Sequence, residues 1–403
     1  GAKMAFVTTA GFRDHIEIGD TLRYTGGLYD HRWVRTPPYP IPHERRFEVA
    51  ERVAGDGALI EPVDEAQVES LARDLDQAGV DAVAICFLNS YVNPANEIRT
   101  GELLAKHLPG RAITLSSVNP EFREYPRFIT AVFNAYITPM IAGYIDRLEA
   151  SLAERVYHRD VLYMTSAGGI ASRGAILREP LQLLYGAVAG GVSAGGFLAR
   201  LGELPNAVTF DMGGTSTDVG FVEDYRPQVV ASKVLVAFPI ALPHLDVRSI
   251  GAGGGSIALV GGDEVIRVGP ESAGAEPGPA CYGLGGFEPT ISDANLLLGR
   301  LASDRPLAGG LVLDSAAAKE AFKAVAEAME TENLVALADG ALTVAVAKMA
   351  GAVREVSVDR GFDPRKFALV GFGGAGPMHG FLVADELGMT EVLIPTARRD
   401  ILI

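Results

Sequence analysis

Cysteine is scarce in this chain, and runs of basic residues are absent. Only Cys86 and Cys281 occur among 403 residues, too few and too far apart for a disulfide framework or a cysteine-rich zinc site. The 35 basic residues are outnumbered by 50 acidic ones, for a formal net charge of -15, which argues against a large surface for nucleic acid or anionic lipid. No apolar run approaches the roughly 20 residues that cross a bilayer, and no signal-peptide pattern opens the chain. We therefore expect a cytoplasmic protein with no nucleic-acid or membrane partner.

Glycine, in contrast, is abundant. The chain contains 47 glycines among its 403 residues, well above the typical share of about 7%. Apolar residues make up 48% of the chain, enough for a sizeable core, and the length predicts two or three domains at about 100 to 200 residues each. The glycines gather in short segments, and these segments direct the search for a functional site.

The first half of the chain follows the strand, helix, strand order of a parallel sheet. Residues 81–88 (DAVAICFL) form a nearly continuous apolar run, typical of a strand buried on both faces. Helical spacing follows at residues 96–107, and a further strand is expected at 112–116. Residues 127–155 predict a long amphipathic helix that is kinked or interrupted near Pro139, because proline removes a backbone donor. The pattern predicts an α/β fold.

A domain boundary is expected at residues 202–206, where glycine and proline precede a new strand. We therefore predict one domain over residues 1–202 and a second over 203–403. Just before the boundary, a helix at 186–201 carries small residues on most of one face, which predicts unusually close packing. The second half is expected to contain long helices at 316–330 and 334–358, rich in Ala and Glu, and a final strand, loop, helix and strand over 367–395.

The segment at residues 207–223 (AVTFDMGGTSTDVGFVE) predicts two strands joined by a glycine-and-hydroxyl turn between two acids, Asp211 and Asp218. Glycines let backbone N–H groups point into one concavity, and hydroxyls add further donors, which suits an anion such as a phosphate. Asp211, at the end of the first strand, can hold a divalent cation opposite those phosphates. The alternative is a hairpin whose turn simply needs positive φ. The candidate phosphate-binding residues are Gly213, Gly214, Thr215, Ser216 and Thr217.

A second glycine segment lies at residues 367–379 (FALVGFGGAGPMH). An apolar strand leads into the glycines, and a helix is expected to start near Pro377, so a nucleotide can lie against the end of the strand and the N-terminus of the helix. The alternative is a tight strand-to-helix packing turn, because the pattern is an inexact GxGxxG. The candidate cofactor-binding residues here are Gly373, Gly374, Ala375 and Gly376.

A third segment, at residues 249–258 (SIGAGGGSIA), brings Gly253 and Gly254 into consideration as places where backbone approaches a ligand closely. His244 and Asp246 precede it and share one face if the strand is extended. They are candidates for a metal site or an acid/base pair, and the alternative is a hydrogen-bonded surface pair. The Gly/Pro-rich loop at 269–286 is expected to be functional, with Cys281 in it a packed thiol.

Several of these motifs, taken together, resemble the hydantoinase/oxoprolinase family. The resemblance implies an A-type subunit with the actin, sugar kinase and Hsp70 type of fold, in which two ribonuclease-H-like domains hold ATP. Family members open with an additional DxGGTxTD hairpin, which this sequence lacks, and carry a small C-terminal part, so we expect a fragment whose first domain is incomplete and which is inactive alone. The matching segments are DMGGTSTD at 211–218, GAGGGSIA at 251–258, VGPESAGAEPGPACYG at 268–283, ISDANLLLGRL at 291–301, GFGGAGPMHG at 371–380, VTTAGFRD at 7–14, REYPRFITAVFNAY at 123–136 and TSAGGIAS at 165–172.

The resemblance implies an ATP-dependent hydrolase that phosphorylates the carbonyl oxygen of a cyclic amide or ureide, such as a hydantoin or 5-oxoproline, for ring opening with a B-type partner subunit. ATP and Mg²⁺ or Mn²⁺ are the implied cofactors, with Asp211 as the metal ligand. Asp218, His244 and Asp246 are the candidates for substrate orientation or proton transfer. An ATP-dependent ketone carboxylase subunit is the enzymatic alternative, and an actin-like nucleotide switch is the alternative of another class.

Overall fold

The computed structural model describes residues 1–19, 41–235, 238–262 and 264–395, and its chain forms two compact units. The first unit consists of Gly1–Ala187 and Val230–His244. The second consists of Val188–Val229 and Leu245–Ile403. The strands β12 (Val229–Val230) and β15 (His244–Leu245) lie where the chain passes from one unit to the other.

The first unit is built on a four-stranded sheet in the order β2-β1-β5-β6, with all neighbours parallel. One face packs on α2 (Glu65–Gln77) and α3 (Ala95–His107), and the other packs on α4 (Glu124–Glu154). Both faces are therefore buried, which is why the predicted strand near residues 81–88 reads as a continuous apolar run. That prediction is confirmed. The strands are β1 (Met4–Thr9), β2 (Arg46–Val49), β5 (Ala82–Cys86) and β6 (Ala112–Leu115).

The predicted interruption at Pro139 is wrong, because α4 continues through this residue over 31 residues. Pro139 lies on an exposed part of the helix, where water can hydrate the backbone carbonyl that loses its donor. The hydroxyl of Thr138, the residue before Pro139, donates to the carbonyl of Asn134 at 2.7 Å.

The N-terminal end of α4 is anchored by a buried arginine. The Arg127 side chain is fully buried, and its guanidinium donates to the carbonyl of Phe87 at 3.1 Å and to the hydroxyl of Ser116 at 3.3 Å. Its charge lies 3.5 Å from a carboxylate oxygen of Glu124 and over the ring of Tyr91. A buried charge needs such partners, so the REYPRF segment is a structural link between α4 and the end of β5.

Smaller elements complete the first unit. The strands β13 and β14 return to it and place Phe238 on Phe133 of α4, with ring centroids 5.6 Å apart. These elements are α1 (His15–Ile18), β3 (Arg52–Val53), β4 (Leu59–Glu61), β7 (Leu162–Met164), β8 (Ile170–Ser172), α5 (Arg173–Arg178), β13 (Lys233–Leu235), β14 (Phe238–Ile240) and 3₁₀ helices at His43–Arg45, Ser116–Val118 and Pro180–Leu183.

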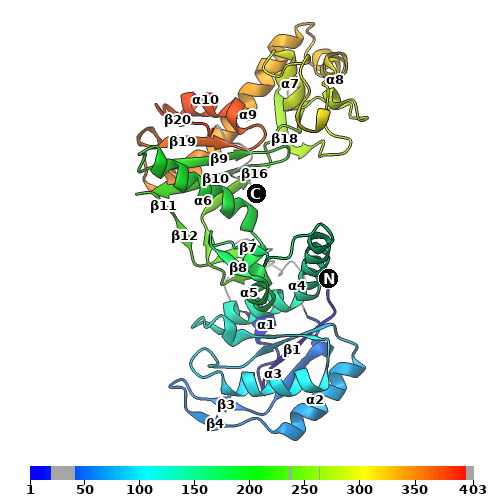
Figure 1. Cartoon of the computed structure of the whole chain (residues 1–403), viewed down its shortest axis with the longest axis vertical. Helices are drawn as coiled ribbons and strands as arrows, with labels where there is room; N and C mark the ends of the chain where they lie inside the picture. Colours follow the sequence, from blue (N-terminus) through cyan, green and yellow to red (C-terminus); the bar gives the residue numbers. More distant parts are fainter. Residues whose placement is uncertain (20–40, 236–237, 263, 396–403) are drawn as a thin grey trace. The chain divides into compact units, whose positions relative to one another are not determined.

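The second unit is built on a six-stranded mixed sheet in the order β11-β10-β9-β19-β20, with β16 also pairing to β10. One face packs on α6 (Gly186–Leu201), and the other packs on α9 (Leu334–Val356) and α10 (Gly376–Leu387) (Figure 1). The strands are β9 (Ala207–Met212), β10 (Thr217–Glu223), β11 (Arg226–Pro227), β16 (Val247–Ile250), β19 (Ala368–Phe372) and β20 (Val392–Leu393).

The small residues of α6 allow the close packing that the sequence predicts. A Cβ added at Gly191 would lie 3.0 Å from the ring of Phe372, and one at Gly195 would overlap the side chain of Thr209. Because α6 packs so closely on this sheet, most of it belongs to the second unit. The units therefore divide the chain at residues 187/188 rather than at the predicted 202/203, and they return residues 230–244 to the first unit.

The rest of the second unit lies beyond the sheet. Two of the described helices, α4 and α9, are long and apolar enough to cross a bilayer. Helices in the core of a domain share these properties, and α4 and α9 each bury side chains in the core of their own unit. The remaining elements are β17 (Ser256–Val260), β18 (Ile266–Ser272), α7 (Ile291–Leu297), α8 (Ser315–Ala328) and 3₁₀ helices at Ala280–Tyr282, Ala308–Gly310, Val358–Arg360 and Pro364–Lys366.

Candidate functional site

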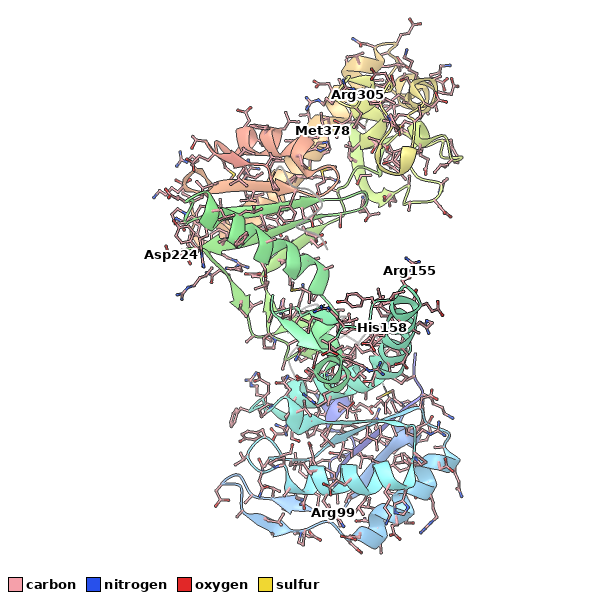
Figure 2. All side chains as sticks on the ribbon, viewed as in Figure 1. Arg99, Arg155, His158, Asp224, Arg305 and Met378 are labelled. Atoms are coloured by element: carbon pink, nitrogen blue, oxygen red, sulfur yellow. The ribbon has the colours of Figure 1, made fainter. Side chains whose placement is uncertain are left out.

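A cavity of about 460 Å³ in the second unit is lined by residues from all three glycine segments that the sequence singles out. Gly213 and Gly214 follow β9, Gly254 precedes β17, and residues 373–375 connect β19 to α10. Met378, labelled in Figure 2, lines the cavity from the first turn of α10. The remaining walls are provided by Tyr282, Ser292, Leu301, Leu307, Phe372, Pro377 and Pro395.

The loop at residues 213–216 is held in shape by its own backbone and by the third glycine segment. The amide of Gly213 donates to the carbonyl of Ser216 at 3.0 Å. The amides of Gly254 and Gly255 donate to the carbonyls of Gly213 and Gly214, at 3.0 and 2.6 Å. These bonds use the amide of Gly213 and the carbonyls of Gly213, Gly214 and Ser216, and the other amides of the loop remain available to a ligand. Within the described chain, the amides of residues 214–216 have no intramolecular acceptor.

Not all of the predicted hydroxyls are free to bind a ligand. The Thr217 side chain is buried, and its hydroxyl donates to the carbonyl of Ala252 at 2.5 Å. Its role is therefore to tie β10 to the segment before Gly253. Thr215 is exposed, and the Ser216 hydroxyl lies 3.4 Å from a carboxylate oxygen of Asp218. Thr215 and Ser216 are the two hydroxyls that remain near the open side of the loop.

Position 253 requires glycine because there is no room for a side chain, and not because of its backbone conformation. A Cβ at this position would lie 2.6 Å from the carbonyl carbon and oxygen of Gly214 and 2.7 Å from the amide of Thr215. At Gly214 itself, and at Gly374, an added Cβ would meet nothing within 4 Å. The side of the loop that faces Gly253 is thus closely packed, whereas the side at Gly214 is open, which is the shape of an anion-binding nest.

Asp211 and Asp218 lie directly opposite each other on the antiparallel strands β9 and β10. Residues in such register point to the same face with their Cβ atoms about 5 Å apart. Burial, and secondly the charge of Asp218, raises the pKa of the Asp211 carboxyl above its ordinary value. Two carboxylates that share a partly buried face are costly together, and a divalent cation relieves that cost.

Gly373 closes over Asp211. Its φ of +83° is favourable only for glycine, and a Cβ at this position would overlap the Asp211 carboxylate and the carbonyl of Met212. The amide of Ala375 then donates to the carbonyl of Met212 at 2.9 Å. The two predicted motifs are therefore in direct backbone contact, as β19 and β9 are parallel neighbours in the sheet.

These features fit Mg²⁺ bound through a carboxylate and a polyphosphate. Mg²⁺ is commonly held by one or two carboxylates together with substrate phosphates rather than by an all-protein cage. In the described part of the chain, no group of three His, Cys, Asp or Glu side chains converges on one point. Asp211, with Asp218 beside it, is the position at which this unit can hold such a cation.

The opposite wall of the cavity is fixed by α7. Thr290 and Asp293 form a capping box at the start of this helix, and the amide of Ser292 donates to the carbonyl of Gly254 at 2.7 Å. Asp293 also accepts from the amide of Cys281 at 2.7 Å. The Cys281 thiol is buried, and burial raises its pKa, so it is a packed thiol as expected.

A buried histidine, which the sequence argument did not single out, links α7 to the glycine turn before α10. The His379 side chain is fully buried. One ring nitrogen lies 2.9 Å from the carbonyl of Ala375, and the other lies 3.1 Å from the amide nitrogen of Asn295. That Asn295 nitrogen also donates to the carbonyl of Ile291 at 2.8 Å. The Nδ1–H tautomer of neutral His379 satisfies both ring contacts. The only sequence signal is its spacing, four residues after Ala375 on a helix.

Protonation of His379 is expected to destabilise the second unit. Burial, and secondly the charge of Arg300, lowers the pKa of His379 from its ordinary value. The unfolded chain therefore binds this proton more readily than the folded chain. The stabilisation by neutral, buried His379 is complete above about pH 6.5 and is lost as the pH falls below that value. Between about pH 7.5 and 5.5, the melting temperature of His379→Gln should fall less than that of the unsubstituted chain.

A matched control for this measurement is His158→Gln, at an exposed position that Figure 2 labels. This variant should keep the full slope. Equal slopes in His379→Gln and the unsubstituted chain would show that His379 does not sense pH in this range.

His244 and Asp246 do not form the shared site that their spacing suggests. The His244 ring is buried, has a nitrogen 2.9 Å from the carbonyl of Leu242 and stacks on Tyr185 at 5.7 Å between centroids. The Asp246 carboxylate instead forms an ion pair with Arg360, and it does not line the cavity. The two side chains are held by different partners and do not form a pair, and the roles expected of them in substrate orientation or proton transfer stay predictions.

Two family models match the chain and together span most of it. The model described as Hydantoinase/oxoprolinase matches residues 127–401, and the one described as Hydantoinase/oxoprolinase N-terminal region matches residues 1–108. The first match includes every residue of the cavity described above.

Curated relatives and a solved structure agree with these models. The chain is 36% identical to the caprolactamase subunit alpha of Pseudomonas jessenii, over 98% of the chain and 57% of that protein. It is 33% identical to the acetophenone carboxylase gamma subunit of Aromatoleum aromaticum, over 94% of the chain and 53% of that protein. It is 33% identical to 5-oxoprolinase of Saccharomyces cerevisiae, over 98% of the chain and 33% of that protein.

The crystal structure of the ATP-dependent caprolactamase from Pseudomonas jessenii superimposes with a TM-score of 0.81 at 35% identity, covering 100% of this chain and 58% of that chain. The chain thus spans between about a third and about three fifths of the length of the relatives it matches.

Proposed function

Because the chain belongs to the hydantoinase/oxoprolinase family, we propose that its second unit binds ATP and that the protein activates the carbonyl of a cyclic amide or ureide for ring opening. The α/β fold is of the actin-like ATPase type, as expected from the sequence. The single observation that carries the proposal is the convergence of the three glycine segments on one cavity, with the loop at residues 213–216 presenting amides that have no acceptor within the described chain.

ATP, when bound, supplies the phosphoryl group that makes an unreactive amide carbonyl electrophilic. The chain's own residues orient the polyphosphate and neutralise charge. The amides of residues 214–216 donate to phosphate oxygens, and the hydroxyl of Thr215 adds a donor on the open side, where the hydroxyl of Ser216 donates to Asp218. Preorganised donors of this kind supply most of the rate in phosphoryl transfer. Asp211 is proposed to hold Mg²⁺ beside them.

The apolar part of the cavity suits the nucleoside. Leu301, Leu307 and Met378 line the cavity, and a Cβ added at Gly374, which also lines it, would meet nothing within 4 Å. A purine buries mostly apolar surface with a few polar contacts, which is the usual composition of a nucleotide pocket. Residues 373–376 are therefore proposed to support the adenosine, as the sequence motif predicts.

A partner subunit is proposed for the complete enzyme. The relatives in Pseudomonas jessenii and Aromatoleum aromaticum are named as subunits, alpha and gamma, of caprolactamase and acetophenone carboxylase. Both names indicate a multi-subunit assembly acting on a small molecule. We propose that a B-type subunit supplies the remaining steps of ring opening.

A ketone carboxylase is the second candidate, favoured by the 33% identity to the acetophenone carboxylase gamma subunit. The cavity for ATP would serve either reaction, since both begin with transfer of a phosphoryl group. The two candidates differ in the co-substrate, because carboxylation requires bicarbonate and a ketone in stoichiometric amounts.

The test is formation of ADP by the full protein together with its partner subunit. We expect ADP release to depend on a cyclic amide and the opened amino acid to accumulate in proportion. ADP release that depends on a ketone and consumes bicarbonate would favour the carboxylase instead. ADP release that ignores every cyclic amide and ketone, with large assemblies in sedimentation, would contradict both and favour an actin-like nucleotide switch.

A further inference from the structure

A second cavity, of about 250 Å³, lies within the first unit. It is formed between α4, the turn that joins β7 to β8, the 3₁₀ helix at Pro180–Leu183 and the segment after β14. Its apolar walls are Leu181, Leu242 and Pro243. The TSAGGIAS segment contributes the exposed Ala167 to its rim.

Two asparagines present unused hydrogen-bonding atoms at this cavity. Asn134 is buried on α4, and its carbonyl oxygen accepts from the amide of Leu181 at 2.9 Å. This bond fixes the orientation of the side chain, and the Asn134 Nδ2 group has no acceptor within the described chain. Asn119 is oriented by a bond from its own Nδ2 to the carbonyl of Ala241 at 2.5 Å. The Asn119 side-chain oxygen is then left as an acceptor.

Glu179 is the charged group of the cavity. One carboxylate oxygen accepts from the side-chain amide of Gln182 at 2.7 Å, and burial raises the pKa of this carboxyl above its ordinary value. The second oxygen has no donor within the described chain. Among the described residues that line this cavity there is no lysine, arginine or histidine, and the charge of the neighbouring Arg178 only partly offsets the effect of burial on Glu179.

We propose that this cavity binds the ring of a small, neutral cyclic amide or ureide. The amide group of such a ring offers one acceptor and one donor side by side. Its carbonyl accepts from Asn134, and its N–H donates to Glu179 or to the side-chain oxygen of Asn119, while Leu181, Leu242 and Pro243 contact the ring carbons. An anionic ring is disfavoured, because the described lining of the cavity includes a carboxylate and no cationic side chain.

This inference rests on the proposed function, which it narrows to substrates without a carboxylate. A ring such as 2-pyrrolidinone or hydantoin fits the donor and acceptor pattern, whereas 5-oxoproline carries a negative charge that Glu179 would repel. Desolvated polar groups of a site reject a ligand that leaves them unpaired, so this arrangement gives selectivity as well as affinity.

The experiment measures binding of 2-pyrrolidinone, hydantoin and 5-oxoproline to the full chain by saturation-transfer NMR and titration calorimetry. We expect the neutral rings to bind at least about tenfold more tightly than 5-oxoproline. Glu179→Gln turns an amide donor toward the ligand N–H and should weaken binding of the neutral rings about tenfold. Ala167→Leu fills the rim from an exposed turn and should remove binding.

Glu154→Gln, at an exposed position at the end of α4, is the matched control and should bind like the unsubstituted chain. Melting curves confirm that each variant is folded, and Glu179→Gln keeps an acceptor for Gln182, so at least one variant tests the site without disturbing the fold. Unchanged binding of the neutral rings in both Glu179→Gln and Ala167→Leu, or tighter binding of 5-oxoproline, would overturn the proposal.

Failure of this proposal is distinguishable from failure of the proposed function. ATP binding is measured on the same samples. Samples that bind ATP but no neutral ring would overturn the inference about the first unit and leave the nucleotide site standing. Samples that bind neither would overturn both.

Discussion

Asp211→Asn is expected to lower ATP-dependent turnover by about a hundredfold or more, because a cation that stabilises the transition state contributes several kcal/mol. The variant keeps the size of the side chain and removes the charge that can hold Mg²⁺ beside the loop at residues 213–216. Asp218 lies opposite in register and equally far from the turn that carries the donors, so the variant leaves one carboxylate beside the loop where the unsubstituted chain has two. Turnover of the full protein with its partner subunit, measured as ADP release, tests this expectation.

The same substitution is expected to raise the melting temperature when no Mg²⁺ or nucleotide is present. Burial and the neighbouring Asp218 raise the pKa of Asp211 in the folded chain, so protonation favours folding, and the cost of the ionised group appears as the pH rises through that pKa. Asparagine removes this cost at neutral pH. Opposite signs for stability and activity distinguish a ligand-binding carboxylate from a structural one.

Asp385→Asn is the control for both measurements, because Asp385 is exposed on α10 of the same unit. It should leave turnover and melting temperature unchanged. Full turnover in Asp211→Asn would rule out the cation role of Asp211, and a lower melting temperature without Mg²⁺ would show that the carboxylate stabilises the fold.

Gly253→Ala is expected to weaken ATP binding at least about tenfold, the result of losing one or two hydrogen bonds to a charged group. The added methyl group would lie 2.6 Å from the carbonyl group of Gly214 and 2.7 Å from the amide of Thr215. The loop must therefore move, and with it the amides that face the cavity. The free energy of unfolding should fall by about 1 to 3 kcal/mol, as for other overpacked sites.

Gly262→Ala is the matched control, because a methyl group at Gly262 meets nothing within 4 Å. Calorimetric titration with ATP and thermal unfolding of the two variants should separate them clearly. If Gly253→Ala binds ATP as tightly as Gly262→Ala does, the loop at residues 213–216 is not the phosphate site.

The hairpin and its acids could be predicted from the sequence because their signal is local. Apolar strands, a glycine turn and acids at equal distances from it fix both the register and the shared face of Asp211 and Asp218, and the structure has this register. The helix start after Gly373 is also local, since Pro377 lies in the first turn of α10. The cytoplasmic location expected from composition stays a prediction.

What the sequence could not supply depends on contacts between distant segments. The hydroxyl of Thr217 resembles those of Thr215 and Ser216 in the sequence, but in the structure it donates a hydrogen bond to the carbonyl of Ala252. His379 becomes a link only because Asn295, on another helix, lies beside it. The unit boundary differs for the same reason, because α6 is close to the first unit in sequence but packs on Thr209 and Phe372 of the second.

Amide hydrogen exchange of the full protein with and without MgATP tests the central claim most directly, namely that the loop at residues 213–216 binds the phosphates of ATP. We expect slower exchange on addition of MgATP at residues 213–216 and at residues 373–378, with the first of these segments unprotected by adenosine. Bound ATP that leaves exchange at residues 213–216 unchanged, or equal protection there by adenosine and ATP, would contradict it.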